Sequence, residues 1–322
     1  MGDVAMTVPI IRLVCMQHPN LKLSILTKPI YVDIFREFTN ANIILLDNKR
    51  HRGILGLFKL CKELKKLNID SVIDLHNVLR TKILKILWGT NFYQIEKGRT
   101  EKQKLISGKI FNQLKSTHQR YLETFNRLNL NLSLSKHKFP NKPETKNLML
   151  LSNKPIKNKL IGISPFAKHK AKTYSIEKII TLIKKLSVNN TILLFGGGAE
   201  EIAKLDEISK QTKNTINLAK DLPLSSQLDY IANLHLMISM DSANGHLAAM
   251  YGVKVLTIWG VTHPYAGFTP FNQPTTNSIT VDRNEFPKIP TSIYGDKCPK
   301  GYENAINSIS VEEIVKKAEE IC

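Results

Sequence analysis

Polar residues stand directly after two short apolar segments in the C-terminal half of the chain. Residues 236–240 are apolar, and Asp241 and Ser242 follow them at once. Residues 253–259 are a second apolar run, and Thr262 comes three positions after it. Runs of this length are typical of buried strands, and a glycine between them marks the end of a short helix. The pattern predicts strand, helix and strand, with polar side chains where each strand ends.

The carboxyl end of a parallel strand is a common ligand site. In open α/β sheets, ligands bind beyond these ends, and the N-terminus of the following helix presents free N–H groups that suit phosphate. We therefore predict that Asp241 and Ser242 line an anion site. His246 lies one turn further on the same helix face and is predicted to support Asp241. The plain alternative is that Asp241 and Ser242 only cap the helix.

The motif has a family resemblance. Asp241-Ser242-Ala243-Asn244-Gly245-His246-Leu247-Ala248-Ala249, followed by Gly260-x-Thr262-x-Pro264, resembles the donor-site signature of glycosyltransferase family 9, the bacterial heptosyltransferases. The resemblance implies an α/β protein of GT-B architecture, with two Rossmann-like domains whose parallel sheets face a cleft. It implies transfer of heptose from ADP-heptose to a hydroxyl of the lipopolysaccharide inner core, with inversion and without a metal. The implied donor-site residues here are Asp241, Ser242, Ala243, Gly245, His246 and Thr262.

A basic segment follows another predicted strand. Lys168 and Lys172 lie just after residues 160–164, where ammonium groups are well placed for a pyrophosphate. Lys172-Thr173-Tyr174 matches the lysine and bulky residue of the family, which implies that Lys172 stabilises the leaving diphosphate. Lys168 is a second candidate for the same contact. The alternative is an ordinary solvated lysine-rich loop.

A run of three glycines, residues 196–198, follows the next strand. Glycine lets the backbone approach a ligand closely, but this run is not the dinucleotide-binding fingerprint. The resemblance implies that Gly197 lies at the donor nucleotide and that Glu200 contacts the nucleoside, with Glu201 next to it. The alternative is a tight turn before a solvated helix.

The first nine residues resemble the first strand-to-helix loop of the family. This implies that Asp3 is the base that deprotonates the acceptor hydroxyl, a role that a carboxylate within hydrogen-bond reach can fill. The alternative is a helix cap. In the family an apolar strand precedes this loop, whereas only Met1 precedes Gly2 here. We expect in-frame upstream codons for an Ile/Val/Leu run, because neighbouring strands would otherwise keep unpaired edges.

Polar and basic residues of the N-terminal half are candidates for the acceptor site. They follow predicted strands or begin a helix, and the resemblance places such segments along the acceptor side. Arginine suits the carboxylates and phosphates of a lipid A–Kdo acceptor. A solvated basic face is the alternative. The candidates are Asp74, His76, Arg80, Lys97, Arg99 and Arg120.

Apolar runs and amphipathic segments alternate through both halves, which predicts parallel sheets. Strands are expected at 21–26, 43–47, 71–75 and 92–95, and helices at 53–67, 80–87 and 112–128. A stretch rich in Pro, Lys and Asn predicts a linker. The predicted domains are an acceptor-binding domain 1–145, a linker 146–159, a nucleotide-sugar-binding domain 160–308 and a helix 309–322.

Composition narrows the classes of protein. The 322 residues carry a net charge of +19, which favours a polyanionic partner or reflects a lysine-rich proteome. No apolar run is long enough to cross a membrane, and four scattered cysteines predict neither a zinc site nor disulfides. We expect a cytoplasmic enzyme without cofactor or metal, in peripheral contact with the anionic inner-membrane face. Its predicted partners are a nucleotide-sugar donor and a phosphorylated glycolipid acceptor.

Two other functions remain open on the sequence. One is a different nucleotide-sugar glycosyltransferase of the same architecture, because a fold does not fix a function. The other is a basic nucleic-acid-binding protein. With 7% aromatic residues and no DNA- or RNA-binding motif, the chain offers few stacking platforms for bases. No specific nucleic-acid partner is therefore predicted.

Overall fold

The computed structural model describes residues 1–143 and 158–322, so residues 146–157 of the predicted linker lie outside the described residues. Apart from Met1 and Gly2, the chain divides into two compact units. The first comprises residues 3–98 and 117–138, and the second comprises residues 99–116 and 139–322.

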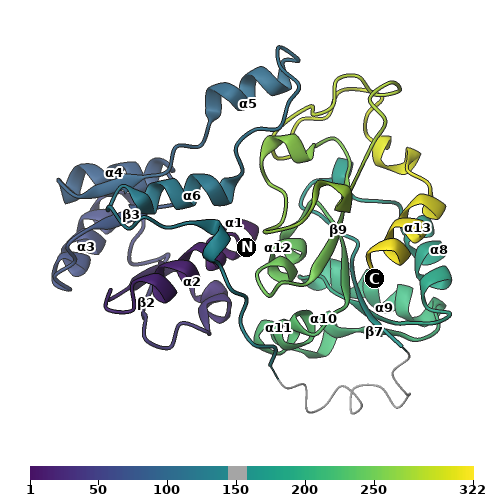
Figure 1. Cartoon of the computed structure of the whole chain (residues 1–322), viewed down its shortest axis with the longest axis horizontal. Helices are drawn as coiled ribbons and strands as arrows, with labels where there is room; N and C mark the ends of the chain where they lie inside the picture. The colour runs from purple at the N-terminus through teal and green to yellow at the C-terminus, as the bar shows by residue number, and fades with distance from the viewer. Residues whose placement is uncertain (144–157) are drawn as a thin grey trace. The chain divides into compact units, whose positions relative to one another are not determined.

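The second unit is built on one parallel sheet (Figure 1). The strand order is β10-β9-β8-β5-β6-β7, and each neighbouring pair is parallel. Nearly every residue of the central strands is buried, as expected for a sheet covered on both faces. The strands are β5 (Leu160–Ser164), β6 (Thr191–Leu194), β7 (Thr215–Asn217), β8 (Leu236–Met240), β9 (Lys254–Trp259) and β10 (Ser278–Thr280).

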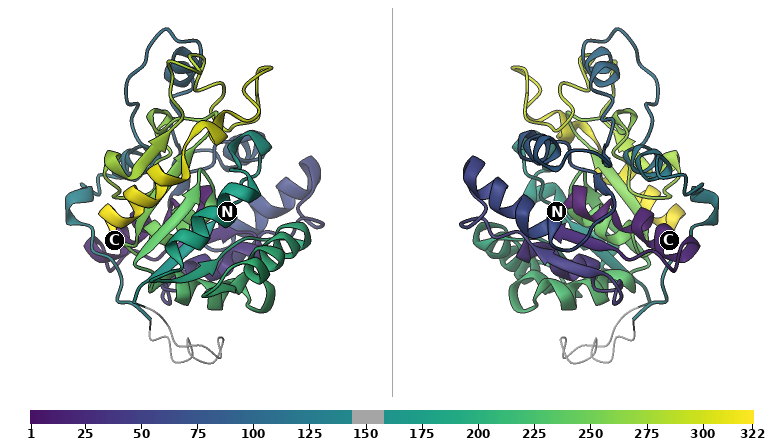
Figure 2. Two further views of the ribbon diagram at one scale, coloured as in Figure 1. Left: turned by 90° about the vertical axis from the view of Figure 1, so that its right-hand side faces the viewer. Right: turned by 90° about the vertical axis from the view of Figure 1, so that its left-hand side faces the viewer.

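Helices cover both faces of this sheet. On one face α8 (Ile176–Leu186), α9 (Ala199–Gln211) and α13 (Val311–Ile321) share a core with alternate strand residues such as Ile163 and Ile238. The other face is covered by α12 (Ala243–Ala249), whose Gly245 contacts Ser239 and Val255. Figure 1 shows α12 and α13 on either side of β9, and Figure 2 (left) shows α13, in yellow, lying across the sheet. Two further helices are α10 (Leu218–Asp221) and α11 (Leu224–Ala232).

The connections after β5 and β8 lead to opposite faces of the sheet. From β5 the chain runs through α8 to β6, and from β8 it runs through α12 to β9 on the other side of β5. The carboxyl ends of β5 and β8 are therefore a topological switch point, where the two loops diverge and leave room for a ligand.

The first unit has four shorter strands, which pair in parallel as β1–β2 and β3–β4. The two pairs are separate sheets, and most of their residues are partly exposed. Its strands are β1 (Ser24–Thr27), β2 (Asn42–Leu45), β3 (Val72–Asp74) and β4 (Phe92–Gln94). Its helices are α1 (Gly2–Ala5), α2 (Val8–Gln17), α3 (Gly53–Lys65), α4 (Leu79–Trp88) and α6 (Thr117–Asn126).

One predicted helix is shorter in the structure. The helix expected over 112–128 is α6, which begins only at Thr117. The residues before it pack against the second unit's own loop instead: Leu114 is buried, and its N–H donates to the carbonyl of Tyr265. The preceding helix α5 (Arg99–Ile106) was not predicted, because only Lys102 and Leu105 are buried in it. None of the described helices is long and apolar enough to span a bilayer.

Candidate active site

A buried ion pair joins the loops that follow β5 and β8. The ammonium of Lys172 lies 2.8 Å from the carbonyl oxygen of Asp241 and 3.0 Å from its Oδ2. The hydroxyl of Thr262, from the loop after β9, donates to the same Oδ2 at 2.8 Å. The structure thus brings together three of the predicted site residues, each from a different strand end.

This pair keeps hydrogen-bonding capacity for a ligand. The side chains of Lys172 and Asp241 are only 10% and 12% exposed, so their charges act in a region of low dielectric. Lys172 has three N–H donors, and Asp241 takes two of them. Among the described residues nothing donates to Asp241 Oδ1. The site can therefore offer one ammonium N–H and one carboxylate oxygen to a bound molecule.

The alternative interpretation, in which the side chains of Asp241 and Ser242 only cap α12, is wrong. Ser242 is the residue before α12, but its side chain accepts no hydrogen bond from that helix. The single hydroxyl proton of Ser239 goes to the carbonyl of Met240 at 2.6 Å, so Ser242 must donate its own proton to Ser239 Oγ, 3.1 Å away. The Asp241 carboxylate is held by Lys172 and Thr262 instead.

Three further donor-site candidates lie in α12. Gly245 and His246 are buried, and Ala243 is partly exposed. The helix has seven residues, so its dipole is short. The predicted contacts of these residues with a phosphate, and of His246 with Asp241, stay predictions. Lys168 is exposed on the loop after β5, and its contact with a diphosphate likewise stays a prediction.

The glycine turn after β6 is held by Glu201 rather than by Glu200. Glu201 Oε2 accepts a hydrogen bond from the N–H of Gly197 at 2.9 Å. Glu200 is 84% exposed and pairs with Lys204 one helical turn on, which lowers the pKa of Glu200. The Glu200 side chain therefore lies in solvent, while Glu201 stabilises the turn. The predicted contact of Glu200 with a nucleoside stays a prediction.

The structure adds residues to the site that the sequence did not single out. Ser164, the last residue of β5, accepts a hydrogen bond from the side-chain amide of Asn244 at 2.8 Å, which ties the two strand ends together. Its place at the carboxyl end of a buried strand was the available signal. The other addition is Gly295, in a loop that packs over Lys172, and no local pattern marks it.

Gly295 makes room for the stem of Lys172. A Cβ at Gly295 would lie 2.7 Å from Cδ, 2.8 Å from Cγ and 3.1 Å from Cε of Lys172. The backbone φ of Gly295 is +82°, a conformation that L side chains rarely adopt. The loop is closed by Ser292, whose buried hydroxyl accepts from the N–H of Gly295 at 2.9 Å. Any side chain at position 295 therefore has to displace Lys172 or the loop.

We expect Gly295→Ala to destabilise the protein more than Gly301→Ala. Gly301 has φ +87°, so both substitutions carry the same backbone strain, but nothing lies within 4 Å of a Cβ at Gly301. The extra cost at Gly295 comes from moving Lys172 off Asp241, and we expect about 1–3 kcal/mol in the free energy of unfolding. Urea unfolding of the two variants measures it. Equal losses would show that Lys172 adapts without strain.

Residues 99–116 hold the loop that carries Thr262. Leu105 and Leu114 form a cluster with Ala266, and Phe111 lies 4.9 Å from the rings of both His263 and Tyr265. The guanidinium of Arg283 stacks 3.5 Å from the centre of the Phe111 ring. Burial and the nearby Arg283 lower the pKa of His263 to about 4, so its imidazole is neutral at pH 7. In that form Nδ1 accepts from the N–H of Tyr265 at 3.2 Å.

The lowered pKa of His263 predicts a loss of stability in acid. Between pH 6.5 and about 4 the unfolded chain binds a proton that the folded chain does not, so falling pH favours unfolding. The contribution is at most about 3 kcal/mol. We expect His263→Asn, which keeps an acceptor for Tyr265, to flatten the curve of unfolding free energy against pH by this amount in that window. Parallel curves for variant and wild type would contradict the assignment.

Several acceptor-site candidates gather in the first unit. Asp3, Asp74 and Lys97 all lie within electrostatic reach of His76. Partial desolvation of the imidazole and then Lys97 lower its pKa, while Asp3 and Asp74 raise it. The Asp74 carboxylate is used locally, because Oδ1 accepts from the backbone N–H groups of His76 and Asn77, and Oδ2 from Gln94. Asp74 thus shapes the turn, while Asp3 and His76 are exposed.

The arginine candidates have different surroundings. Arg120 is buried, its guanidinium contacts Gly98, and Nη1 lies 3.4 Å from the carbonyl of Glu96, so it supports the turn that presents Lys97. Arg80 is partly exposed at the start of α4. Arg99 begins α5 and belongs to the second unit, so the structure does not place it with the other candidates. Acceptor binding by all six candidates stays a prediction.

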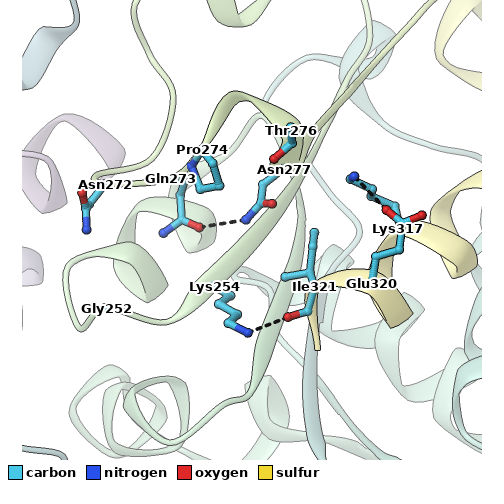
Figure 3. A pocket seen from close by; sticks show the side chains of 10 residues that line it. All are labelled: Gly252, Lys254, Asn272, Gln273, Pro274, Thr276, Asn277, Lys317, Glu320 and Ile321. Atoms are coloured by element: carbon cyan, nitrogen blue, oxygen red, sulfur yellow. Dashed lines mark hydrogen bonds and ion pairs between the residues drawn. The ribbon is translucent and has the colours of Figure 1, made fainter.

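A surface pocket of about 450 Å³ lies elsewhere in the second unit (Figure 3). It is lined by Lys254, the first residue of β9, together with Gln273 and Lys317. The ammonium of Lys254 donates to the carbonyl of Ile321 at 2.7 Å, and Lys317 pairs with Glu320. This pocket is at the amino end of β9, whereas the Lys172–Asp241–Thr262 network is at the carboxyl ends, so it is not part of the candidate site.

Comparison with known proteins gives a consistent picture. The family model of glycosyltransferase family 9 (heptosyltransferase) matches residues 57–300. Lipooligosaccharide heptosyltransferase 2 of Campylobacter jejuni serotype O:2 is 25% identical over 329 residues, which cover 100% of this chain and 95% of the relative. Lipopolysaccharide heptosyltransferase 3 of Escherichia coli K12 is 24% identical over 338 residues, covering 99% of this chain and 95% of the relative.

Solved structures share the fold. A family 9 glycosyltransferase from Veillonella parvula superimposes with a TM-score of 0.75 at 16% identity, covering 100% of this chain and 94% of that one. Escherichia coli heptosyltransferase WaaC with ADP gives a TM-score of 0.70 at 19% identity, covering 100% and 97%. The predicted α/β GT-B fold is thereby confirmed. Since the family model spans well over half of the sequence, this chain belongs to glycosyltransferase family 9, the heptosyltransferases.

Proposed function

We propose that this enzyme moves a heptose from ADP-heptose to a hydroxyl of the lipopolysaccharide inner core. The observation that carries the proposal is the buried Lys172–Asp241–Thr262 network at the switch point of the second unit's sheet. It offers a fixed positive charge where parallel sheets bind ligands. The Campylobacter and Escherichia coli relatives are heptosyltransferases, which supports heptose as the transferred sugar.

The second unit would bind the donor. Lys172 keeps one N–H for the diphosphate, and its ammonium offsets the negative charge that grows as the sugar–phosphate bond breaks. Asp241 fixes the lysine and keeps Oδ1 for a donor hydroxyl. Glu200, exposed beside the glycine turn, would contact the nucleoside. We assign Lys168, Gly197 and the α12 residues to the outer contacts of the same donor.

The first unit would bind the acceptor and activate it. Asp3 takes the proton of the acceptor hydroxyl, whose oxygen then attacks the anomeric carbon of the heptose. The bond from that carbon to the β-phosphate oxygen breaks, and ADP leaves with the electron pair. A single displacement of this kind inverts the anomeric configuration. Lys97 and Arg80 supply positive charge for the phosphates and carboxylates of a lipid A–Kdo acceptor, and His76 supplies a hydrogen-bonding imidazole.

We propose further that the reaction needs neither a cofactor nor a metal, since Lys172 supplies the positive charge that a cation would otherwise provide. We place the enzyme in the cytoplasm, at the anionic inner face of the membrane that holds its acceptor. The four cysteines, all free, support a reducing compartment. The net charge of +19 supports attraction to an anionic surface.

Thermal unfolding with different nucleotides tests the donor. A ligand that binds only the folded enzyme raises the melting temperature, and the gain in stability grows with the logarithm of its concentration over Kd. We expect ADP and ADP-heptose to raise it, and UDP- or GDP-sugars to leave it unchanged. Stabilisation by UDP- or GDP-sugars alone would refute the heptose assignment and favour another nucleotide-sugar glycosyltransferase.

A turnover assay tests the remaining steps. With ADP-heptose and a deacylated Kdo-containing acceptor, we expect ADP release, a product whose new anomeric centre is inverted relative to the donor, and unchanged rates in EDTA. Loss of activity in EDTA that returns with a divalent cation would overturn metal independence. Retained configuration would overturn the single displacement.

A further inference from the structure

Helices α3 and α4 of the first unit expose large apolar side chains to solvent. Leu55 is 84% exposed, Ile86 80%, Leu79 76%, Ile54 62% and Phe58 52%. The helices need none of these for their own packing, because their inner faces already form a core in which Leu57, Leu60, Cys61 and Leu84 are buried. Soluble proteins rarely leave so much apolar surface uncovered without a partner for it.

The two helices run in the same direction. Lys65, at the end of α3, donates to the carbonyl of Leu87 at 3.0 Å, and its ammonium lies 5.9 Å from the Trp88 ring, at the end of α4. Their first turns therefore lie at a common end, which brings Ile54, Leu55 and Phe58 to the same end as Leu79. Figure 1 shows α3 and α4 next to one another.

That common end is the carboxyl end of β2 and β3, because α3 and α4 follow these strands. Both connecting turns are built alike: Asp47 accepts from the N–H groups of Lys49 and Arg50, and Asp74 accepts from those of His76 and Asn77. The apolar first turns thus adjoin the turn of His76, a candidate acceptor residue.

Basic residues accompany the apolar ones. Residues 49–66 and 79–88 contain ten lysines and arginines and one acidic residue, Glu63, which accounts for a net +9 of the chain's +19. On α3 the outward stripe changes from apolar to basic along the helix, as exposed Lys59, Lys62 and Lys66 follow Leu55 and Phe58 at helical spacing. Lys82 and Lys85 are exposed on α4.

We propose that this surface, residues 52–66 and 79–86, docks the enzyme on an anionic phospholipid bilayer. The apolar side chains gathered at the common end, together with Ile86 near the end of α4, match the acyl chains of such a bilayer, and the lysines along both helices match its charged headgroups. A second protein copy would place eight basic residues against eight, and nucleic acid would leave Leu55 and Leu79 without an apolar partner. The inference rests on the proposed function, and it names the surface that brings the acceptor turn to the membrane.

Co-sedimentation with vesicles that contain no glycolipid tests the proposal. We expect the wild type to bind phosphatidylethanolamine–phosphatidylglycerol vesicles in a salt-sensitive way and phosphatidylcholine vesicles weakly. Leu55→Ser/Phe58→Ser/Leu79→Ser should weaken binding at least about tenfold, because three apolar insertions are lost. Val188→Ser, at a side chain 62% exposed in the second unit, should leave binding unchanged.

Two triple variants that remove the same charge distinguish binding by this surface from binding through the overall positive charge of the protein. Lys59→Gln/Lys62→Gln/Lys66→Gln should weaken binding strongly, while Lys184→Gln/Lys213→Gln/Lys288→Gln, which removes three exposed charges from the second unit, should weaken it little. A tryptophan placed by Leu55→Trp should shift its emission to the blue on adding anionic vesicles, whereas Val188→Trp should not.

Three results would overturn the proposal: equal binding by the serine triple variant and wild type, equal effects of the two lysine triples, or a self-associated wild type that the serine triple variant turns into monomers. Neither donor nor acceptor enters these measurements. Failure of the heptose assignment would instead appear in the melting temperatures with nucleotides, so the two failures are distinguishable.

Discussion

Replacing Lys172 by methionine is expected to lower the turnover number by about 10²- to 10³-fold, because the departing ADP loses its fixed positive charge. Methionine keeps an unbranched stem of similar length, so the space under Gly295 stays filled. The measurement is the initial rate at saturating donor and acceptor. Affinity for ADP, measured by titration calorimetry, should fall as well, since Lys172 also contacts the diphosphate before reaction.

Two further variants show whether the loss is chemical or structural. Lys170→Met removes an exposed lysine from the same short turn and should keep the rate. Lys172→Met leaves the Asp241 carboxylate buried without its cation, which costs about 3–5 kcal/mol of stability. Lys172→Met/Asp241→Asn removes both charges, so it should recover much of that stability without recovering turnover. Recovery of turnover in the double variant would assign Lys172 a structural role only.

The parts of the site that could be predicted share a physical basis. Lys172, Asp241 and Thr262 come from the loops after three strands, and the carboxyl ends of parallel strands meet at one edge. The bounds of these strands could also be predicted. β5 and β8 begin and end where the apolar runs do, because a strand buried on both faces carries few polar residues. Local periodicity was therefore enough to place the three loops together, and the family resemblance selected Lys172, Asp241 and Thr262 within them.

Other features depend on contacts that no local pattern carries. Ser242 stands where a capping residue would, but a hydrogen bond to Ser239 from the preceding strand takes its hydroxyl. Gly295 is distant in sequence from Lys172, and only the folded loop shows why it has no side chain. The helix expected from residue 112 starts at Thr117, because tertiary contacts of Leu114 outweigh its helical propensity.

The acceptor half was the least predictable for a related reason. Residue type, position near strand ends and the family resemblance made Asp74 and Arg120 candidates, yet both are buried and support turns, one beneath His76 and one beneath Lys97. Sequence pattern finds charged residues near strand ends but does not distinguish those that hold a turn from those that face solvent. The supporting pair leaves the exposed Asp3 and His76, and the partly exposed Arg80 and Lys97, as the first unit's candidates for contact with an acceptor.

Asp3→Asn should lower the turnover number by about 10²- to 10⁴-fold, because an amide cannot take the proton of the acceptor hydroxyl. Asparagine matches aspartate in shape, and Asp3 is exposed, so stability should change little. ADP affinity should also stay unchanged, since Asp3 has no proposed role in donor binding. A variant that keeps ADP binding and loses turnover would match loss of the base.

The pKa of His76 provides an independent measurement of the effect of Asp3→Asn. The Asp3 carboxylate raises the pKa of His76 against the larger lowering by burial and Lys97, so Asp3→Asn should lower that pKa further. The imidazole carbon-bound protons report it in an NMR titration of the free enzyme. If His76 were the base, His76→Gln would cause the larger loss of turnover. Asp3→Asn would then shift the acidic limb of the pH–rate profile to lower pH, by the same amount as the NMR titration shows for the pKa of His76. With Asp3 as the base, Asp3→Asn abolishes most turnover at every pH, and the shift in the pKa of His76 appears only in the NMR titration.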